Sequence, residues 1–245
     1  MKLFPTSTAA ALAIAAAVPA AADVATTYST DFQGDGWSYL WNAPSDWDLA
    51  ASPVTSDGST GAITSIADYE PLIESTDNLL TATGSSSFPT QVPSNFLRLT
   101  PFNGQPGLGR AQAGSGYNNS VERYAIAAYT VMEDGVYSIV DSTIDRNSGS
   151  AGTDDYVNLL VYTDPNSPVL SKQFTDAAGD FNVEVGQLSA GDTIYVAVGA
   201  DRFATGDFFM WNFSIDVQPA AVPEPTSGAF LLGMGLLAAR RRRRL

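Results

Sequence analysis

The side chains that most often perform catalysis are missing from this chain of 245 residues, which has no histidine and no cysteine. Without histidine it has no Ser-His-Asp triad, no HExxH zinc site and no imidazole general base. Without cysteine it has no disulfide, no thiolate zinc site and no thiol nucleophile. The remaining possibilities are carboxylate chemistry, cation binding by oxygen ligands, and recognition without catalysis.

Carboxylate chemistry means above all glycoside hydrolysis, which needs two carboxyl groups roughly 5–10 Å apart in a cleft. None of the five glutamates before residue 218 lies in a motif typical of an acid or a nucleophile: Glu70, Glu74, Glu122, Glu133 and Glu184. We therefore assign no catalytic residue. The protein is not expected to be an enzyme, because histidine, the commonest general acid–base residue, is absent.

Aspartate pairs offer a second kind of oxygen chemistry. Three pairs lie in turn-like contexts where carboxylates can gather around Ca²⁺: Asp31 and Asp35, Asp154 and Asp155, and Asp201 with Asp207. No loop has the EF-hand spacing, and aspartate is common at solvated turns. The sequence therefore supports no metal ligand and no cofactor, with Ca²⁺ binding as the alternative.

Three of the four tryptophans fall within the sequence GWSYLWNAPSDW, residues 36–47. Trp37, Tyr39 and Trp41 would share one face of a strand, and Trp47 follows them. Exposed, these rings would form a stacking platform of the kind that sugar rings favour. Buried, they would fill a core, which is the commoner fate of large aromatic residues. Both interpretations stay open, and these four residues are the ligand-binding candidates.

The sequence predicts that the elements positioning these groups are β-strands. In FFMWNFSIDV, residues 208–217, every second residue from Phe209 to Val217 is apolar, and Asn212, Ser214 and Asp216 lie between them. This alternation is typical of a half-buried strand. Similar patterns predict strands at 37–41, 96–100, 124–131, 136–140, 156–162, 181–185 and 192–199. Many short strands without helical periodicity predict an all-β fold: an antiparallel two-sheet sandwich of jelly-roll type.

The predicted sandwich domain covers residues 23–217. Within it, residues 43–94 are rich in Ser, Thr, Asp, Gly and Pro, which indicates long surface loops or an insertion. Residues 218–225 form a Pro/Ala linker of extended, semi-rigid character. Residues 23–239 carry six basic residues and all 26 acidic ones, a net charge of −20. Such a surface repels phosphate backbones, so nucleic acid is not an expected partner.

The N-terminal sequence predicts a signal peptide over residues 1–22. Lys2 gives a short positive region, and residues 9–18 form an apolar helix-forming region of suitable length. Small residues follow, and the pattern Ala20-Ala21-Ala22 predicts cleavage after Ala22. We therefore expect an exported protein.

The C-terminal end predicts a short transmembrane helix. Residues 226–239 are 14 residues without a charge. As a helix they span about 21 Å, less than the roughly 30 Å hydrocarbon core, although snorkelling and bilayer thinning offset part of the difference. Five arginines follow, Arg240, Arg241, Arg242, Arg243 and Arg244. By the positive-inside rule they stay cytoplasmic, which leaves the acidic body outside the membrane.

Pro223, Glu224 and Pro225, the apolar segment and the terminal arginines together resemble the PEP-CTERM sorting signal of exported bacterial proteins. The resemblance implies that an exosortase-type enzyme removes the tail, residues 226–245, after a transient stay in the inner membrane. It also implies a final place at the cell-envelope surface or in the extracellular matrix of bacteria that make extracellular polysaccharide.

The body has a fainter resemblance to jelly-roll domains of exported bacterial proteins, some of which are similar to carbohydrate-binding modules. It rests on WSYLWN, on ERYAIAAYTV and on GDTIYVAVGADR with GDFFMWNFSI. Three functional hypotheses follow. The first is a non-catalytic glycan-binding protein that takes extracellular polysaccharide as its partner. The second is a structural surface or adhesion protein without a sugar site, and the third is a carboxylate glycosidase.

Overall fold

The computed structural model describes residues 23–43, 63–76, 78–85, 97–107, 122–146, 156–175, 177–200 and 207–219. All of them belong to one compact unit, Ala22–Ala220. The predicted signal helix, residues 220–225 of the linker and the hydrophobic tail lie outside the described residues. Within the described part no helix is long and apolar enough to cross a membrane.

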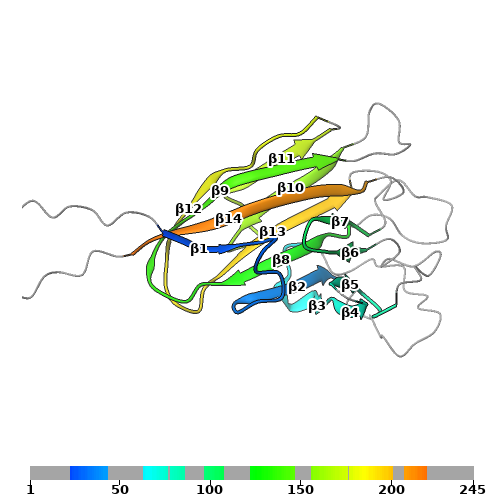
Figure 1. Cartoon of the computed structure of the whole chain (residues 1–245), viewed down its shortest axis with the longest axis horizontal. Helices are drawn as coiled ribbons and strands as arrows, with labels where there is room; N and C mark the ends of the chain where they lie inside the picture. The colour runs from blue at the N-terminus through cyan, green and yellow to red at the C-terminus, as the bar shows by residue number, and fades with distance from the viewer. Residues whose placement is uncertain are drawn as a thin grey trace, which may run out of the picture. The chain divides into compact units, whose positions relative to one another are not determined.

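The described residues form fourteen strands and one short 3-10 helix, Ile66–Asp68. Eight strands make one sheet in the order β12-β9-β14-β7-β6-β5-β4, with β1 also paired to β14 (Figure 1). Their bounds are β1 Asp23–Thr27, β4 Ile73–Thr76, β5 Leu79–Thr81, β6 Arg98–Leu99, β7 Asn103–Gln105, β9 Gly135–Arg146, β12 Val183–Leu188 and β14 Phe209–Pro219.

The other six strands make a second sheet in the order β11-β10-β13-β8-β2-β3. Their bounds are β2 Trp37–Asn42, β3 Tyr69–Pro71, β8 Ala125–Thr130, β10 Val157–Tyr162, β11 Leu170–Phe174 and β13 Thr193–Ala200. Neighbouring strands run antiparallel in both sheets, from β2 against β8 to β9 against β14. The predicted all-β architecture of two antiparallel sheets is therefore confirmed.

The core lies between the two sheets. Strand β14 shows why: Phe209, Trp211 and Phe213 are buried, whereas Met210 between them is exposed. Inward residues of β8, β10 and β13 from the other sheet join the same hydrophobic cluster. The register of β14 against β9 shifts between Asn212 and Ser214, where Asp141 of β9 has a φ of +48°. The bulge adds a residue to β9 without interrupting the alternation in β14.

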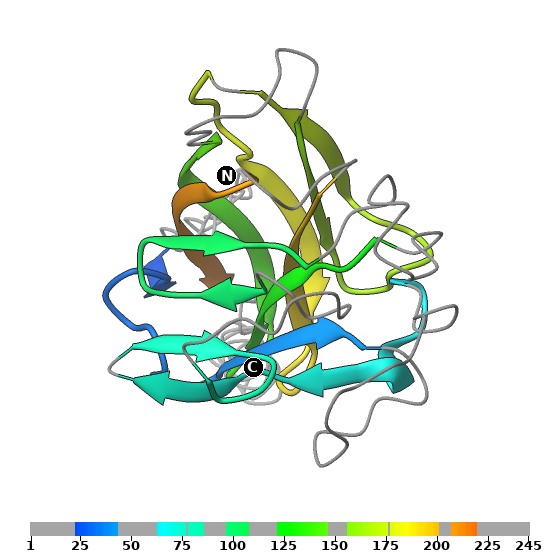
Figure 2. The same cartoon turned by 90° about the vertical axis from the view of Figure 1, so that its right-hand side faces the viewer.

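Several strands have no alternating pattern that would predict them. Within residues 43–94, for which we expected loops, the chain forms β3, β4 and β5 (Figure 2, in cyan and blue-green). Each is short and pairs with a neighbouring strand. Strands β3 and β4 have no buried residue, whereas Leu80 and Thr81 of β5 are buried. Strand β9 runs beyond the expected residues 136–140, to Arg146.

The outer face of the six-stranded sheet carries a second apolar cluster, which makes β8 buried on both faces. Tyr124, Ile126, Tyr162 and Tyr195 are buried there, and Tyr69 packs against them. The Tyr162 and Tyr195 rings stack with centroids 5.1 Å apart, and the Tyr69 and Tyr162 hydroxyls lie 2.8 Å apart. Burial raises the pKa of Tyr69 to about 12.

A buried carboxylate lies at one end of the same face. Glu122 is 4% exposed and accepts hydrogen bonds from the Tyr124 hydroxyl at 2.8 Å and from the Asn158 amide at 2.9 Å. Gly199 makes room for it, because an added Cβ would lie 2.5 Å from Glu122 Oε1. The absence of a side chain at Gly199 therefore lets Glu122 reach across β13 to β10.

Candidate functional site

The aromatic residues considered as either a platform or part of the core are mostly buried. Tyr39 is 7% exposed and Trp41 is fully buried, and both belong to the core between the sheets. Trp37 is half-buried and packs against that core. A ring that stacks on a sugar must be accessible, so Trp37, Tyr39 and Trp41 do not form a binding platform. Trp47 lies outside the described residues.

Trp37 and Tyr39 belong to an aromatic cluster where the chain passes from β1 to β2. Tyr28 is at its centre, with ring centroids 5.6 Å from Trp37, 5.0 Å from Trp211 and 5.2 Å from Phe213. Trp37 and Tyr39 stack nearly parallel at 6.3 Å. The cluster joins residues that are far apart in the sequence and supports the connection between the two sheets.

The connection itself, residues 28–36, is held by its own backbone. Asp31 N–H donates to the Thr27 carbonyl at 2.9 Å, and Gly34 N–H donates to the Asp31 carbonyl at 2.7 Å. The Gly36 carbonyl accepts from Thr130 N–H at 2.9 Å, which ties the loop to β8. Gly36 has a φ of +83°, and an added Cβ would lie 2.8 Å from the Tyr129 ring. Glycine is therefore required at this position both by backbone conformation and by space.

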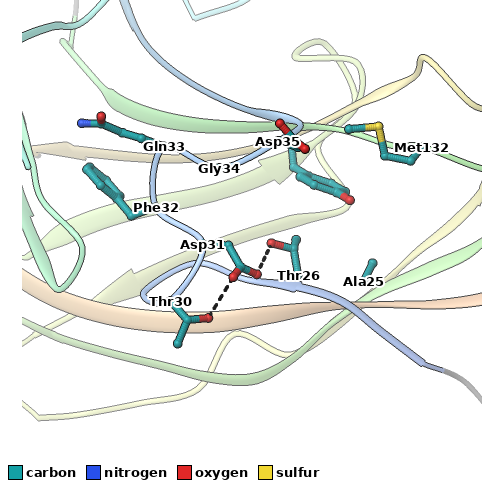
Figure 3. A pocket seen from close by; sticks show the side chains of 10 residues that line it. Ala25, Thr26, Thr30, Asp31, Phe32, Gln33, Gly34, Asp35 and Met132 are labelled. Carbon is teal, nitrogen blue, oxygen red and sulfur yellow. Dashed lines mark hydrogen bonds between the residues drawn. The ribbon is translucent and has the colours of Figure 1, made fainter.

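A pocket of about 510 Å³ opens between this loop and the end of β8 (Figure 3). Phe32, Tyr129 and Met132 give it apolar surface, while threonine, aspartate and glutamine side chains give it hydrogen-bonding groups. Met132 is 57% exposed. The complete lining is Ala25, Thr26, Thr30, Asp31, Phe32, Gln33, Gly34, Asp35, Tyr129 and Met132.

The Asp31 carboxylate is the most strongly bonded polar group of the pocket. It accepts hydrogen bonds from the Thr26 hydroxyl at 2.8 Å, from Thr27 N–H at 2.8 Å and from the Thr30 hydroxyl at 3.2 Å. Figure 3 draws its bonds to Thr26 and Thr30 as dashed lines. The Thr27 N–H, followed by the Thr26 hydroxyl, lowers the pKa of Asp31 below its ordinary value.

Trp37 and Tyr39 form hydrogen bonds to pocket residues from the side of the core. Trp37 Nε1–H donates to the Thr26 hydroxyl at 2.9 Å, and that hydroxyl donates to Asp31 Oδ2. Gln33 N–H donates to the Tyr39 hydroxyl at 3.1 Å. Burial raises the pKa of Tyr39 above its ordinary value, which favours the protonated hydroxyl still further. Trp37 and Tyr39 thus orient pocket residues instead of contacting a ligand themselves.

Of the aspartate pairs proposed for Ca²⁺, Asp31 and Asp35 do share one site, because both line the pocket. Asp207 is different: it is fully buried, and Arg146 Nε donates to it at 3.0 Å. Asp207 is therefore not a solvated turn residue, since its carboxylate compensates a buried guanidinium. Asp154, Asp155 and Asp201 lie outside the described residues. Over the described ranges no group of three or more His, Cys, Asp or Glu side chains is arranged to hold a metal.

Of the ten lining residues, sequence reasoning found Asp31 and Asp35 and did not find the other eight. Six of these lie close to Asp31 in the chain: Ala25 and Thr26 belong to β1, and Thr30, Phe32, Gln33 and Gly34 belong to the turn that the aspartates indicated. Tyr129 and Met132 come from the end of β8, about a hundred residues further on. The sequence contains one local signal for this wall of the pocket: Met132 directly follows the apolar run 124–131, at the end of a predicted strand.

The solved structures to which this chain is similar include two with low TM-scores. An isomalto-dextranase of Arthrobacter globiformis T6, complexed with panose, has a TM-score of 0.27 and 19% identity, and the match covers 57% of this chain. The chain spans 21% of that enzyme's length. The K3 cleaved adhesin domain of Lys-gingipain from Porphyromonas gingivalis W83 has a TM-score of 0.29 and 11% identity, with 57% and 90% of the two chains covered.

Comparison with curated proteins gives no match. The family comparison matches the C-terminal end, and it includes Pro223, Glu224 and Pro225 together with Arg240 to Arg244, the residues expected to form the sorting signal. Those residues lie outside the described part of the structure. The chain therefore carries a PEP-CTERM protein-sorting motif over residues 221–244, the signal of an exported protein.

Proposed function

We propose that this protein works at the cell-envelope surface or in the extracellular matrix, where its two-sheet body binds a glycan without cleaving it. The sorting motif supports the location. Before it arrives there, the chain passes through an inner-membrane intermediate, from which an exosortase-type enzyme removes the tail. The pocket beside the β1–β2 connection supports the binding role.

One observation carries the binding role: apolar surface and hydrogen-bonding side chains meet in one accessible pocket. Phe32 and Met132 offer surface for the C–H face of a sugar ring. Thr30, Asp35 and Gln33 are exposed and offer partners for its hydroxyl groups. Small-molecule sites typically combine mostly apolar walls with a few placed polar groups.

Asp31 does not suit the general-acid role of a glycosidase. A glycosidase needs one carboxylic acid whose pKa is raised, so that it is protonated when it meets the glycosidic oxygen. The hydrogen bonds to Asp31 have the opposite effect and hold its pKa down. Asp31 is therefore suited to accept hydrogen bonds and unsuited to deliver a proton.

The finer fold assignment belongs to the same proposal: we infer jelly-roll connectivity. Its support is the strand order β1-β14-β9-β12 in one sheet and β8-β13-β10-β11 in the other. From β8 to β10, and again from β11 to β14, the chain changes sheet at every step. Repeated crossing between two four-strand groups is the pattern of a double Greek key.

A second candidate function is a structural or adhesive surface protein without a sugar site. The observation that favours it is the burial of Tyr39 and Trp41 in the core, which removes the aromatic platform. Under this alternative the pocket is a surface depression and nothing more.

A binding titration separates the two candidates. The full-length chain, in a mild non-ionic detergent, is titrated with a panel of neutral and charged oligosaccharides while tryptophan emission is recorded, with and without Ca²⁺. Trp37 reports on the pocket because its indole contacts Thr26. Glycan binding predicts a saturable change. A requirement for Ca²⁺ would make Asp31 and Asp35 metal ligands as well.

Two matched variants test whether any binding uses the pocket. Met132→Ala removes exposed apolar surface from the pocket wall, and Val169→Ala removes exposed apolar surface before β11. We expect Met132→Ala to weaken binding by about three- to tenfold, as expected for the loss of roughly 1 kcal/mol of apolar contact. Val169→Ala should leave the affinity unchanged. If no glycan in the panel binds, the structural alternative is correct.

A further inference from the structure

The charge of the pocket restricts the kind of glycan that it accepts. Asp31 and Asp35 are the charged residues among the ten lining side chains, and no lysine or arginine is among the described residues that line it. A third carboxylate, Glu133, lies near the lining residue Tyr129. Burial is the largest cause of the raised pKa of Tyr129, and the charges of Asp31 and Glu133 raise it further. The electrostatic potential at this site is therefore negative from several sides.

The basic residues of the described part serve other contacts. Arg146 bonds to buried Asp207 at 3.0 Å, and Arg123 donates to the Asn42 carbonyl at 2.7 Å. Arg98 lies over the Phe208 ring and Lys172 over the Phe174 ring, each at 4.9 Å. Each of these residues lies outside the β1–β2 connection, residues 28–36. The carboxylates of the pocket therefore have no basic neighbour among the described residues that line it.

The carboxylate of Asp31 is ionised at neutral pH, because its hydrogen bonds lower its pKa. Three donors hold its carboxylate, and they favour the ionised form. An anionic sugar such as a uronate must bring its own carboxylate beside this group, which costs binding free energy. A sugar with a positive charge gains from the same arrangement.

We propose that the pocket selects saccharides that carry a protonated amine, such as glucosamine units with a free amino group, over neutral and anionic saccharides. This inference rests on the proposed function, because it concerns glycan binding at the same pocket. The ammonium group faces the carboxylates of Asp35 and Asp31. The C–H face of the ring packs on Phe32 and Met132, as for any sugar.

Isothermal titration calorimetry with the full-length chain tests the selection. Three soluble oligomers of similar length are compared: glucosamine, N-acetylglucosamine and galacturonate. At about pH 5.5 the amine is protonated and the carboxylate of Asp31, whose pKa is lowered, is ionised. We expect the glucosamine oligomer to bind at least about tenfold more tightly than its N-acetylated counterpart at low salt, with a smaller preference at about 0.3 M salt, where screening is strong.

A pair of variants separates the pocket from the acidic surface as a whole. Asp35→Asn removes one charge from the pocket, and Glu184→Gln removes one charge from exposed β12, at the far edge of the larger sheet. We expect Asp35→Asn to lower the preference for the amine by at least about threefold and Glu184→Gln to leave it unchanged. Equal losses in both variants would overturn the inference, because the attraction would then belong to the whole acidic surface.

The remaining outcomes distinguish this inference from the proposed function. Equal affinities for the amine and the N-acetyl oligomers, or tighter binding of galacturonate, would overturn the inference and leave glycan binding intact. If none of the three oligomers binds, while the chain is folded by circular dichroism, both the inference and the proposed function are wrong for these sugars.

Discussion

Replacing Thr26 by valine tests the connection between the aromatic cluster and the pocket. The buried Thr26 hydroxyl accepts from Trp37 Nε1 at 2.9 Å and donates to Asp31 Oδ2 at 2.8 Å. Valine has nearly the same shape, so the substitution removes both hydrogen bonds without a large cavity. Trp37 and Asp31 each lose one hydrogen-bond partner, and the resulting loss of stability measures the contribution of the Thr26 hydroxyl to the free energy of unfolding.

The two losses differ in size. An indole N–H left without an acceptor in a buried setting costs about 1–3 kcal/mol, and the half-buried Trp37 belongs at the lower end of that range. The bond to Asp31 contributes about 0.5–1 kcal/mol, because that carboxylate is exposed and keeps two other donors. The sum is about 2 kcal/mol, which for a domain of about 200 residues lowers Tm by roughly 4–8 °C.

Thermal unfolding followed by near-ultraviolet circular dichroism measures this loss, with Thr30→Val as the control. The exposed Thr30 hydroxyl donates to Asp31 over a longer distance, 3.2 Å, so its removal should cost less than about 0.5 kcal/mol. If Thr26→Val unfolds within about 1 °C of the parent chain, or if Thr30→Val loses as much, the Trp37–Thr26–Asp31 chain does not stabilise the loop.

Acid adds an independent check. The pKa of Asp31 is lowered in the folded state, so its carboxylate stabilises the fold above the unfolded value and loses this effect as pH falls through the folded pKa. Thr26→Val returns that pKa toward its ordinary value. The stability difference between the parent chain and the variant should therefore narrow below about pH 4. A difference that stays constant down to about pH 2 would show that Asp31 has no part in it.

Three further predictions concern other parts of the body. Gly199→Ala places a Cβ 2.5 Å from Glu122 Oε1 and should cost about 1–3 kcal/mol in urea unfolding; an unchanged midpoint would refute the packing argument. Burial, and then the charge of Asp141, raises the pKa of Asp216, so its ionised form destabilises the fold at neutral pH and protonation relieves this as pH falls through the folded pKa. Asp216→Asn should therefore raise Tm at pH 7 and have little effect at about pH 3, and a lower Tm at pH 7 would contradict this. Burial raises the pKa of Tyr69 to about 12, so absorbance at about 295 nm should show its ionisation delayed beyond that of exposed tyrosines, whose pKa is about 10, with stability lost as pH rises toward 12. Ionisation of every tyrosine near pH 10 in the folded protein would contradict it.

The long strands were predictable because each carries its own evidence. In β14 the residues at alternating positions from Phe209 to Val217 are buried, as the period-2 pattern requires. Strand β7 shows the opposite case. Its sequence NGQ contains no apolar residue, and Gly104 is needed because the Phe209 ring occupies the space where a side chain would lie. That requirement comes from β14, about a hundred residues away, and no local pattern contains it.

The same limit applies to the candidate site. The aspartates at 31 and 35 indicated a polar turn, and the structure places both in one pocket. The other wall comes from Tyr129 and Met132 through the pairing of β2 with β8. The burial of charged residues could not be predicted from local sequence either. Arg146 and Asp207 lie 61 residues apart, and their charges compensate each other only after folding.

The aromatic residues that first suggested a binding surface have a structural role that also bears on function. Trp37 and Tyr39 pack in the core, and each also makes one hydrogen bond to a pocket residue, Trp37 to Thr26 of β1 and Tyr39 to Gln33 of the β1–β2 connection. Truncating either ring would therefore change folding and pocket geometry together, and a loss of binding in such a variant would not identify a ligand contact. Met132 and Asp35 are exposed and line the pocket, so substitutions there change the ligand surface while the core remains intact. A loss of binding can therefore be assigned to a ligand contact when Met132 or Asp35 is substituted. Trp37 should be left unaltered, as the fluorescent reporter of binding.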